Sequence, residues 1–148
     1  MPVSKKIIRV AAVVIIDRAQ RVLTVRKRGT FRFMQPGGKP DPGESGLQTA
    51  IREVSEEIGL QLHAEQLTAM GTFSAAAANE ADFEVVCENF LVTLNDDAEA
   101  VLEDLQPAAE IDELRWIPLA QLQPSQDLAP LLTDEVAPAV RRLITATA

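Results

Sequence analysis

The sequence predicts an α+β fold formed by residues 1–148 as a single domain. Two segments rich in Val and Ile come first, then a loop and a strongly amphipathic helix, and the order of strands followed by a helix then repeats. Strand-rich segments combined with a small number of helices are typical of α+β proteins. The length suits one domain, because domains commonly contain about 100 to 150 residues. With 47% hydrophobic and 24% charged residues, the composition is that of an ordinary globular chain.

The first two strands are expected to form a β-hairpin. Residues 6–17 and 21–28 are rich in Val and Ile, and the polar stretch Asp17-Arg18-Ala19-Gln20 provides a turn between them. Residues 35–43 follow with three glycines and three prolines. This composition is incompatible with a regular element and predicts a shaped loop.

An amphipathic helix is expected over residues 44–58, which contain no proline. Aliphatic residues recur in it at spacings of four, three and four, at Leu47, Ile51, Val54 and Ile58. Ser45 and Gln48 have the spacing of a capping box at its start. Gly59 directly follows the last apolar position, where glycine commonly ends a helix in the left-handed conformation.

Further strands are expected over residues 67–78, 82–94 and 111–117. The polar residues Asn79-Glu80-Ala81 would form the turn between the first two of these strands. Residues 95–109 are acidic and contain Pro107, so they predict a loop or a short helix. Residues 128–144 have apolar positions close to helical spacing but contain Pro130 and Pro138, which predicts a terminal helix that is broken or begins late.

The charge is unevenly distributed along the chain. Residues 1–40 hold ten basic residues and the single acid Asp17, whereas the rest holds four basic and 21 acidic residues. The net charge of −8 argues against a general nucleic-acid binder, because phosphate backbones repel an acidic surface. The asymmetry suits a site with a basic wall for an anionic substrate and an acidic wall for a metal, although a solvated surface accounts for many of these charges equally well.

A cytoplasmic location without membrane attachment is expected. Cys87 is the one cysteine, so no intrachain disulfide can form and a reducing compartment is the simplest environment. The apolar run at residues 10–16 is short for a secretory signal, ends at Asp17 and lacks a small-residue cleavage site after it. No stretch approaches the roughly 20 apolar residues that cross a bilayer.

The predicted helix carries a cluster of glutamates that points to metal chemistry. Glu53, Glu56 and Glu57 are spaced i, i+3 and i+4, so they share one helix face and repel each other. A hard divalent cation such as Mg²⁺ prefers oxygen ligands and would relieve this repulsion. A triplet of glutamates on its own is more commonly an ordinary solvated helix face.

The surroundings of the triplet decide between these interpretations. Gly38 is followed after five residues by Glu44 and after seven more by Arg52-Glu53-Val54-Ser55-Glu56-Glu57-Ile58-Gly59-Leu60. This pattern fixes the residue type at seven positions between Gly38 and Leu60. At average residue usage, a chance match to all seven is on the order of 10⁻⁸ per start site. This pattern resembles the signature of the Nudix hydrolase family, and the organisation of the chain resembles the MutT-like branch. Gln35-Pro36-Gly37 and residues 110–118 also look like family features.

The resemblance implies an α/β/α sandwich with a mixed β-sheet and a metal site between the loop and the helix. The main-chain carbonyl of Gly38 and the carboxylates of Glu53, Glu56 and Glu57 would ligate Mg²⁺, or Mn²⁺ in its place. Glu44 and Arg52 would hold these ligands in position, Arg52 through a bidentate contact with a carboxylate.

The implied reaction is the attack of an activated water on a phosphorus of a diphosphate, which requires a base for the proton of the water. In the family this base is a glutamate of the signature or one from a loop outside it. Glu110, six residues before Trp116, is the candidate from outside, as base or additional ligand. Glu103 and Glu113 compete with it.

Basic residues near the loop are candidates for binding the phosphates of the substrate. Lys39 follows the flexible Gly37-Gly38 pair, where a phosphate can approach the backbone closely. Arg26, Lys27 and Arg28 end the second predicted strand. Because strand side chains alternate, these three cannot all face the site.

The expected substrate is a small-molecule nucleotide, with a nucleoside triphosphate, unmodified or oxidised, as the leading candidate and pyrophosphate as a product. Families that act on ADP-ribose commonly carry a proline about 15 residues after the signature, and dinucleoside polyphosphate hydrolases carry a tyrosine. Ser74 and Ala75 occupy that region and the chain has no tyrosine, so ADP-ribose and dinucleoside polyphosphates are alternative substrates only. Nucleotide sugars are a further alternative. Base-pocket candidates are Phe33, Phe73, Phe83, Phe90 and Asp127.

A nucleotide-sensing module without catalysis is the rival from another class, but such modules usually lose signature carboxylates and this chain retains them all. Removal of pyrophosphate from RNA ends is disfavoured by the acidic balance after residue 40. The oligomeric state, monomer or homodimer, stays open.

Overall fold

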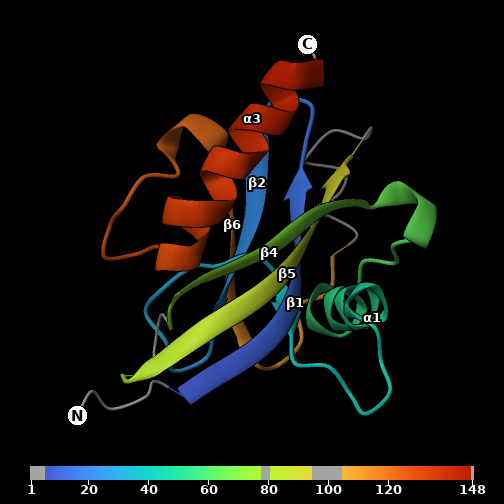
Figure 1. Ribbon diagram of the computed structural model, residues 1–148, viewed down its shortest axis with the longest axis vertical. Coiled ribbons are helices and arrows are strands. Elements are labelled where there is room, and N and C mark those ends of the chain that lie inside the picture. The colour runs from blue at the N-terminus through green and yellow to red at the C-terminus, as the bar shows by residue number, and fades with distance from the viewer. Residues whose placement is uncertain (1–5, 78–80, 95–104, 148) are drawn as a thin grey trace.

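The computed structural model describes residues 6–77, 81–94 and 105–147 and contains a mixed β-sheet between helices (Figure 1). The sheet has the strand order β4-β5-β1-β2-β6, with β3 paired to β1. β1 and β5 run parallel along their full length, and the neighbouring pairs are antiparallel. The strands span Lys6–Ile16 (β1), Arg21–Lys27 (β2), Gly37–Gly38 (β3), Thr68–Ala76 (β4), Phe83–Thr93 (β5) and Ile111–Pro118 (β6).

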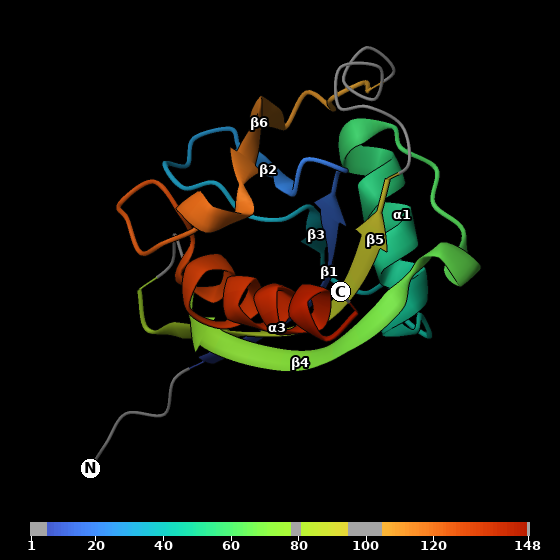
Figure 2. The ribbon, with the colours of Figure 1, turned by 90° about the horizontal axis from the view of Figure 1, so that it is seen from above.

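Strand β1 contributes to two hydrophobic cores, because its side chains alternate between the faces of the sheet. Its odd-numbered positions from Ala11 to Ile15 pack with α1 (Gly46–Ile58). Its even-numbered positions from Ala12 to Ile16 pack with the terminal helix, which consists of the π-helical segment η3 (Leu131–Val136) and α3 (Ala137–Thr147). The helices therefore cover opposite faces (Figure 2), which confirms the predicted α/β/α sandwich.

The expected hairpin of β1 and β2 forms next to its turn. Asp17 is 3% exposed and accepts hydrogen bonds from the main-chain N (2.8 Å) and the Nε (2.9 Å) of Arg21. Beside this turn, Ile16 pairs with Val22. The predicted hairpin is therefore confirmed beside its turn, and farther from the turn the two strands separate.

The strands separate because residues 34–38, here called the inserted segment, lie between them. Their main chain pairs with Val25 on the β2 side and with Ala11, Ala12 and Val13 on the β1 side. A Cβ added to Gly37 would fall 2.7 Å from the Cα of Ala12, so glycine is required there. The loop predicted over residues 35–43 thus begins as part of the sheet.

Helix α1 has the termini that the sequence predicts. Ser45 Oγ accepts from the main chain of Gln48 (3.1 Å), the Gln48 side chain accepts from the main chain of Ser45 (2.9 Å), and Gly59 ends the helix at a φ of 75°. A Cβ added to Gly46, the first residue of α1, would overlap the side-chain carboxylate of Glu88 from β5. Both ends of α1 are therefore defined, and its first turn lies against the side chain of Glu88.

The later elements agree with expectation where the structure describes them. β4 and β5 are antiparallel, β6 follows, and short 3₁₀ helices at Ala64–Gln66 (η1) and Leu119–Gln121 (η2) were not foreseen. Asn79-Glu80 of the expected turn and residues 95–104 lie outside the described residues.

The terminal helix begins late, after Pro130, and its wide π turn ends at Val136, two residues before Pro138, which has no N–H to donate. Among the described residues, no helix has both the length and the apolar character required to cross a membrane.

One methyl group added to the inserted segment should strongly destabilise the fold. Gly37→Ala should lower the free energy of unfolding by about 2–3 kcal/mol, because the new Cβ meets the main chain of β1 rather than a movable side chain. Gly43→Ala is the control, since Gly43 has a φ of 79° but open space around it, and should lose about 1 kcal/mol. Urea unfolding measures both, and equal losses would contradict the close packing at Gly37.

Candidate active site

A cleft of about 550 Å³ opens where the inserted segment meets α1. Charged residues on one side form what we call the acidic wall, consisting of Glu53, Glu56, Glu57 and Glu110. Aliphatic residues form the apolar wall, consisting of Ile8, Val10, Val85 and Leu131. Lys27 and Lys39 also line the cleft, so it offers both signs of charge together with an apolar surface.

Arg52 connects the loop to the carboxylates of α1. Its guanidinium donates to both carboxylate oxygens of Glu44, at 2.7 and 2.9 Å. It also donates to Glu53 at 2.9 Å and to Glu56 at 3.1 Å. The hydrogen bonds from Arg52 lower the pKa of Glu44 to about 2, and the main-chain N–H of Asp41 is the second largest cause. Arg52 therefore faces an ionised Glu44 and restricts the rotamers of two acidic-wall residues.

The same guanidinium fixes the loop before α1. Arg52 Nη2 donates to the main-chain carbonyl of Lys39 at 3.0 Å, and Arg52 Nε lies 3.2 Å from the carboxylate of Asp41. Sequence reasoning missed Asp41, since it occupies a variable position of the signature. The loop that carries Lys39 is consequently tied to the helix that carries the glutamates.

Glu57 is a buried carboxylate at the junction of loop and helix. It is 1% exposed, accepts a hydrogen bond from Gly37 N at 2.8 Å and lies 3.7 Å from Lys27 Nζ. Burial raises its pKa to about 7, although Lys27 and the N–H of Gly37 act in the opposite direction. The nearby charges of Glu53 and Glu110 raise the pKa further. Additional positive charge would stabilise the ionised form of Glu57.

The donors present suit a hard divalent cation. Gly38 lies directly against Glu53, since a Cβ on Gly38 would fall 2.6 Å from Glu53 Oε2. A glycine carbonyl and three carboxylates are oxygen donors of the kind that Mg²⁺ and Mn²⁺ accept. Within the described ranges, no three acidic, histidine or cysteine side chains already converge as a metal cage. Arg52 and Lys27 instead hold the carboxylates that would have to converge.

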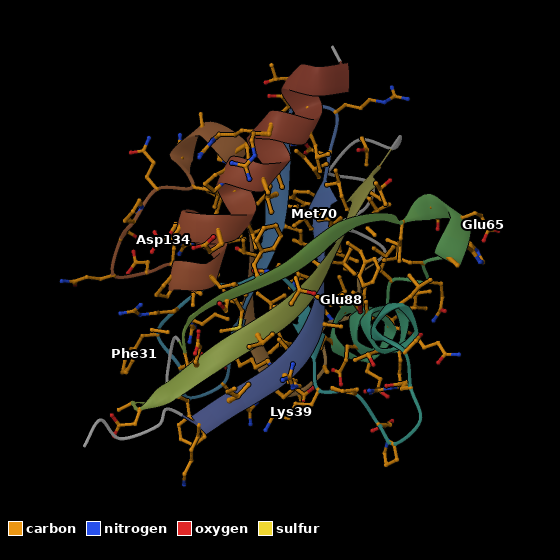
Figure 3. The ribbon with its side chains drawn as sticks, in the orientation of Figure 1. Phe31, Lys39, Glu65, Met70, Glu88 and Asp134 are labelled. Atoms are coloured by element: carbon orange, nitrogen blue, oxygen red, sulfur yellow. The ribbon has the colours of Figure 1, made fainter. Side chains whose placement is uncertain are left out.

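Of the three basic residues Arg26, Lys27 and Arg28, the last of which lies just after β2, Lys27 lines the cleft. Arg26 pairs with Asp112 and Glu113 at 3.4 and 3.6 Å, and its guanidinium lies over the ring of Phe33. Arg28 lies 3.6 Å from Asp112. Neither arginine lines the cleft in the described part of the chain, because partners on β6 and the alternation of strand side chains direct them elsewhere. Lys39, predicted for the same role, is exposed and lines the cleft (Figure 3).

The candidates for the base are placed differently. Glu110 is exposed at the turn before β6 and belongs to the acidic wall. Glu113 pairs with Arg26 and Arg115 and does not line the cleft that the described residues form. Glu103 lies outside the described residues.

None of the predicted base-pocket residues lines the cleft as the described residues form it. Phe33 and Phe90 are buried in the two cores, Phe73 packs against one of them and Phe83 lies beneath Lys6. The apolar wall, Gln35 and Cys87 take their place. The parallel pairing of β1 with β5 brings the residues of these two strands together at the cleft, and no local sequence signal revealed this pairing.

Two curated relatives match parts of this chain. A Bacillus subtilis (strain 168) protein, named provisionally as an 8-oxo-dGTP diphosphatase, is 39% identical over 49 residues, or 33% of this chain. Nudix hydrolase 3 of Caenorhabditis elegans is 37% identical over 98 residues and covers 59% of this chain. The matches span 33% and 37% of the relatives' own lengths.

The fold is shared over almost the whole chain with the crystal structure of a MutT protein from Methanosarcina mazei Go1. The TM-score is 0.70 at 19% sequence identity, and the match covers 99% of each chain. The sequence model of the NUDIX domain matches residues 6–142, which include the loop, α1 and the entire sheet. The chain therefore belongs to the NUDIX domain family.

Proposed function

We propose that this chain is a pyrophosphohydrolase that requires Mg²⁺ or Mn²⁺ and cuts a phosphoanhydride bond in a nucleotide. The observation that carries the proposal is the acidic wall, which brings four glutamates to one cleft together with Lys27 and Lys39. Excess negative charge beside two lysines suits a site that binds a metal and a polyphosphate together.

The metal would be held by Glu53, Glu56, Glu57 and the carbonyl of Gly38. When bound, Mg²⁺ supplies positive charge to the phosphate oxygens and makes water a stronger acid. Arg52 keeps Glu53 and Glu56 in place through hydrogen bonds of 2.9 and 3.1 Å. The N–H of Gly37 orients Glu57. Preorganisation of this kind reduces the rearrangement that binding requires.

The lysines would bind the polyphosphate from two sides of the cleft. Lys39 is exposed and its loop is held by Arg52, so its ammonium can follow a phosphate without moving the backbone. Lys27 pairs with Glu57 at 3.7 Å, a separation that leaves its ammonium open to a second anion. Both side chains would neutralise phosphate charge as the bond breaks.

Glu110 is the base that we assign. It would accept the proton of the attacking water while the oxygen of that water bonds to phosphorus, and pyrophosphate would leave with the electrons of the broken P–O bond. Its support is its place in the acidic wall and its exposure, which lets it reach water. A glutamate of the signature is the alternative, and Glu57 is the most enclosed of these.

A nucleoside triphosphate, unmodified or oxidised, is the proposed substrate class. The apolar wall offers an uncharged surface for a base and sugar beside the phosphate region, and about 550 Å³ suits one nucleotide. The name of the Bacillus subtilis relative points the same way. ADP-ribose, nucleotide sugars and dinucleoside polyphosphates are the alternatives. A non-catalytic sensor is the rival, and the complete set of signature carboxylates favours catalysis over it.

A hydrolysis screen tests the function. Nucleoside triphosphates, including 8-oxo-dGTP, would be compared with ADP-ribose, nucleotide sugars and dinucleoside polyphosphates, and the products identified by ion-exchange chromatography. We expect nucleoside monophosphate and pyrophosphate from the first group, no turnover in EDTA, and recovery with Mg²⁺ or Mn²⁺. Full turnover in excess chelator would refute the metal requirement.

Glu57→Gln tests whether Glu57 serves the metal. We expect kcat to fall by about 100-fold or more and Mg²⁺ affinity to fall with it, because an amide replaces a carboxylate poorly at a hard cation. Metal-free stability should hold or rise slightly, because the amide oxygen can still accept from Gly37 and a buried charge is removed. Thermal melts in EDTA and Mg²⁺ titrations of the rate measure both. Glu65→Gln, at an exposed position of η1, is the control, and a less stable metal-free protein with normal turnover would exclude the metal role.

Glu110→Gln tests the assignment of the base. A loss in kcat of about 10² or more is expected with an unchanged melting temperature, the usual scale for removal of a general base. Glu113→Gln is the matched control, because Glu113 follows three residues later but pairs with Arg26 and Arg115 outside the cleft. Initial rates at saturating substrate distinguish the two variants. If Glu110→Gln stays within threefold of the unaltered protein, the base lies elsewhere.

A further inference from the structure

Gln35 is a largely buried polar residue that lines the cleft. Its exposure is 5%, and it lies in the inserted segment two residues before Gly37. Its side-chain Nε2 donates to Oδ1 of Asn89, which is 0% exposed, at 3.0 Å. The metal chemistry and phosphate binding described above do not use this pair.

The orientation of the Gln35 carboxamide follows from the main chain of β5. Asn89 Nδ2 donates to the carbonyl of Cys87 at 3.0 Å, and a carbonyl can only accept. Asn89 must therefore direct Oδ1 away from this carbonyl, toward Gln35. Since Oδ1 can only accept, Gln35 must present Nε2 to it. The Cys87 thiol, whose pKa burial raises to about 12, stays protonated and also lies within donating distance of Oδ1, at 3.5 Å.

The remaining oxygen of Gln35 is then available to a ligand. Among the residues that the structure describes, none donates a hydrogen bond to Gln35 Oε1. Within the same residues, the side-chain atom that is fully enclosed without a partner is Trp116 Nε1. Gln35 Oε1 is therefore not sealed in the core, and the cleft is the open space that Gln35 borders. An oriented, unpaired acceptor in such a place is complementary to a donor on a ligand.

The surroundings identify the part of the ligand that lies there. Gln35 is close to Cys87 and Asn89, on the face of the sheet that also bears Val10 and Val85 of the apolar wall. The charged partners of a polyphosphate lie instead on the acidic wall and on Lys27 and Lys39. A flat, uncharged group with N–H donors on its edge fits the surface near Gln35, and a nucleobase has these properties.

We propose that Gln35 is a specificity-determining residue whose Oε1 accepts a hydrogen bond from an N–H group of the substrate's nucleobase, with Asn89 as the positioning residue that orients it. The inference rests on the proposed function, since it places the phosphates of the same substrate at the acidic wall. It narrows the substrate class to nucleotides whose base carries an amino or ring N–H group on the edge that enters the cleft.

Equilibrium binding of paired nucleotides tests this assignment. Isothermal titration calorimetry with Mg²⁺ would compare the α,β-methylene forms of ATP and GTP with that of purine riboside triphosphate, whose base lacks any N–H donor. The intact protein should bind at least one of the first two about 10-fold more tightly than the third, the scale of one hydrogen bond at a desolvated site. Gln35→Met should reduce this preference to near unity and leave the affinity for inorganic tripolyphosphate unchanged. Gln121→Met, at an exposed position of η2, should retain the preference.

The outcomes separate this inference from the proposed function. Equal affinity of the intact protein for all three nucleotides, or a preference that survives Gln35→Met, would overturn the role of Gln35. The comparison in the intact protein needs no variant, so it decides even if Gln35→Met fails to fold. Turnover of ATP or GTP, measured in parallel, reports on the function independently. Selective binding without turnover would reject the hydrolase and retain the base contact.

Asn89→Ala distinguishes positioning from a purely structural role. Without Asn89 the carboxamide of Gln35 is free to rotate, so the preference for N–H-bearing bases should fall although Gln35 is present. A purely structural role predicts a lower melting temperature with the preference intact. That result would overturn the assignment of Asn89.

Discussion

The close contact between the glycines of the inserted segment and strand β1 is the constraint on which the site depends. Gly37 and Gly38 pair with Ala12 and Ala11, and at Gly37 the distance leaves no space for a side chain. The contact keeps β1 and β2 apart and directs the N–H of Gly37 to Glu57. It also places Gly38 against the carboxylate of Glu53. A loop rich in glycine and proline thereby gains the rigidity of a sheet where it meets the helix.

The charges of the acidic wall are arranged around this rigid junction. A single guanidinium, that of Arg52, contacts Asp41, Glu44, Glu53 and Glu56. Ion pairs near the surface contribute little to stability individually, so the network is better understood as a means of orienting carboxylates than of holding the fold together. Glu57 differs because it is enclosed, and its ionisation depends on nearby positive charge. The site therefore combines carboxylates that Arg52 orients near the surface with the desolvated carboxylate of Glu57.

Features that depend on neighbouring positions in the chain could be predicted from the sequence. Ser45, Gln48 and Gly59 define α1 through contacts within a few residues, and the spacing of the glutamates along the helix is enough to place them on one face. Features that depend on distant pairing could not. The hydrogen bond between Gln35 and Asn89 joins residues 54 positions apart. Strand β5 pairs in parallel with β1 although β2, β3, α1, η1 and β4 lie between them in the sequence. Arg26 could not be distinguished from Lys27 before the partners of each on β6 and α1 were known.

The two walls of the cleft are built from different parts of the chain. Glu53, Glu56 and Glu57 come from α1, whereas the apolar wall comes from β1, β5 and η3. Ile8, Val10 and Val85 are only partly buried, and although Val10 and Val85 pack against one core, changes in their size should disturb it less than changes at sealed positions. Such changes also leave the contacts of Arg52 intact, because none of these residues takes part in them. For the proposed hydrolase, reaction and substrate preference would thus be separable traits, and directed evolution could alter the second through three aliphatic positions while the carboxylates of α1 stay unchanged.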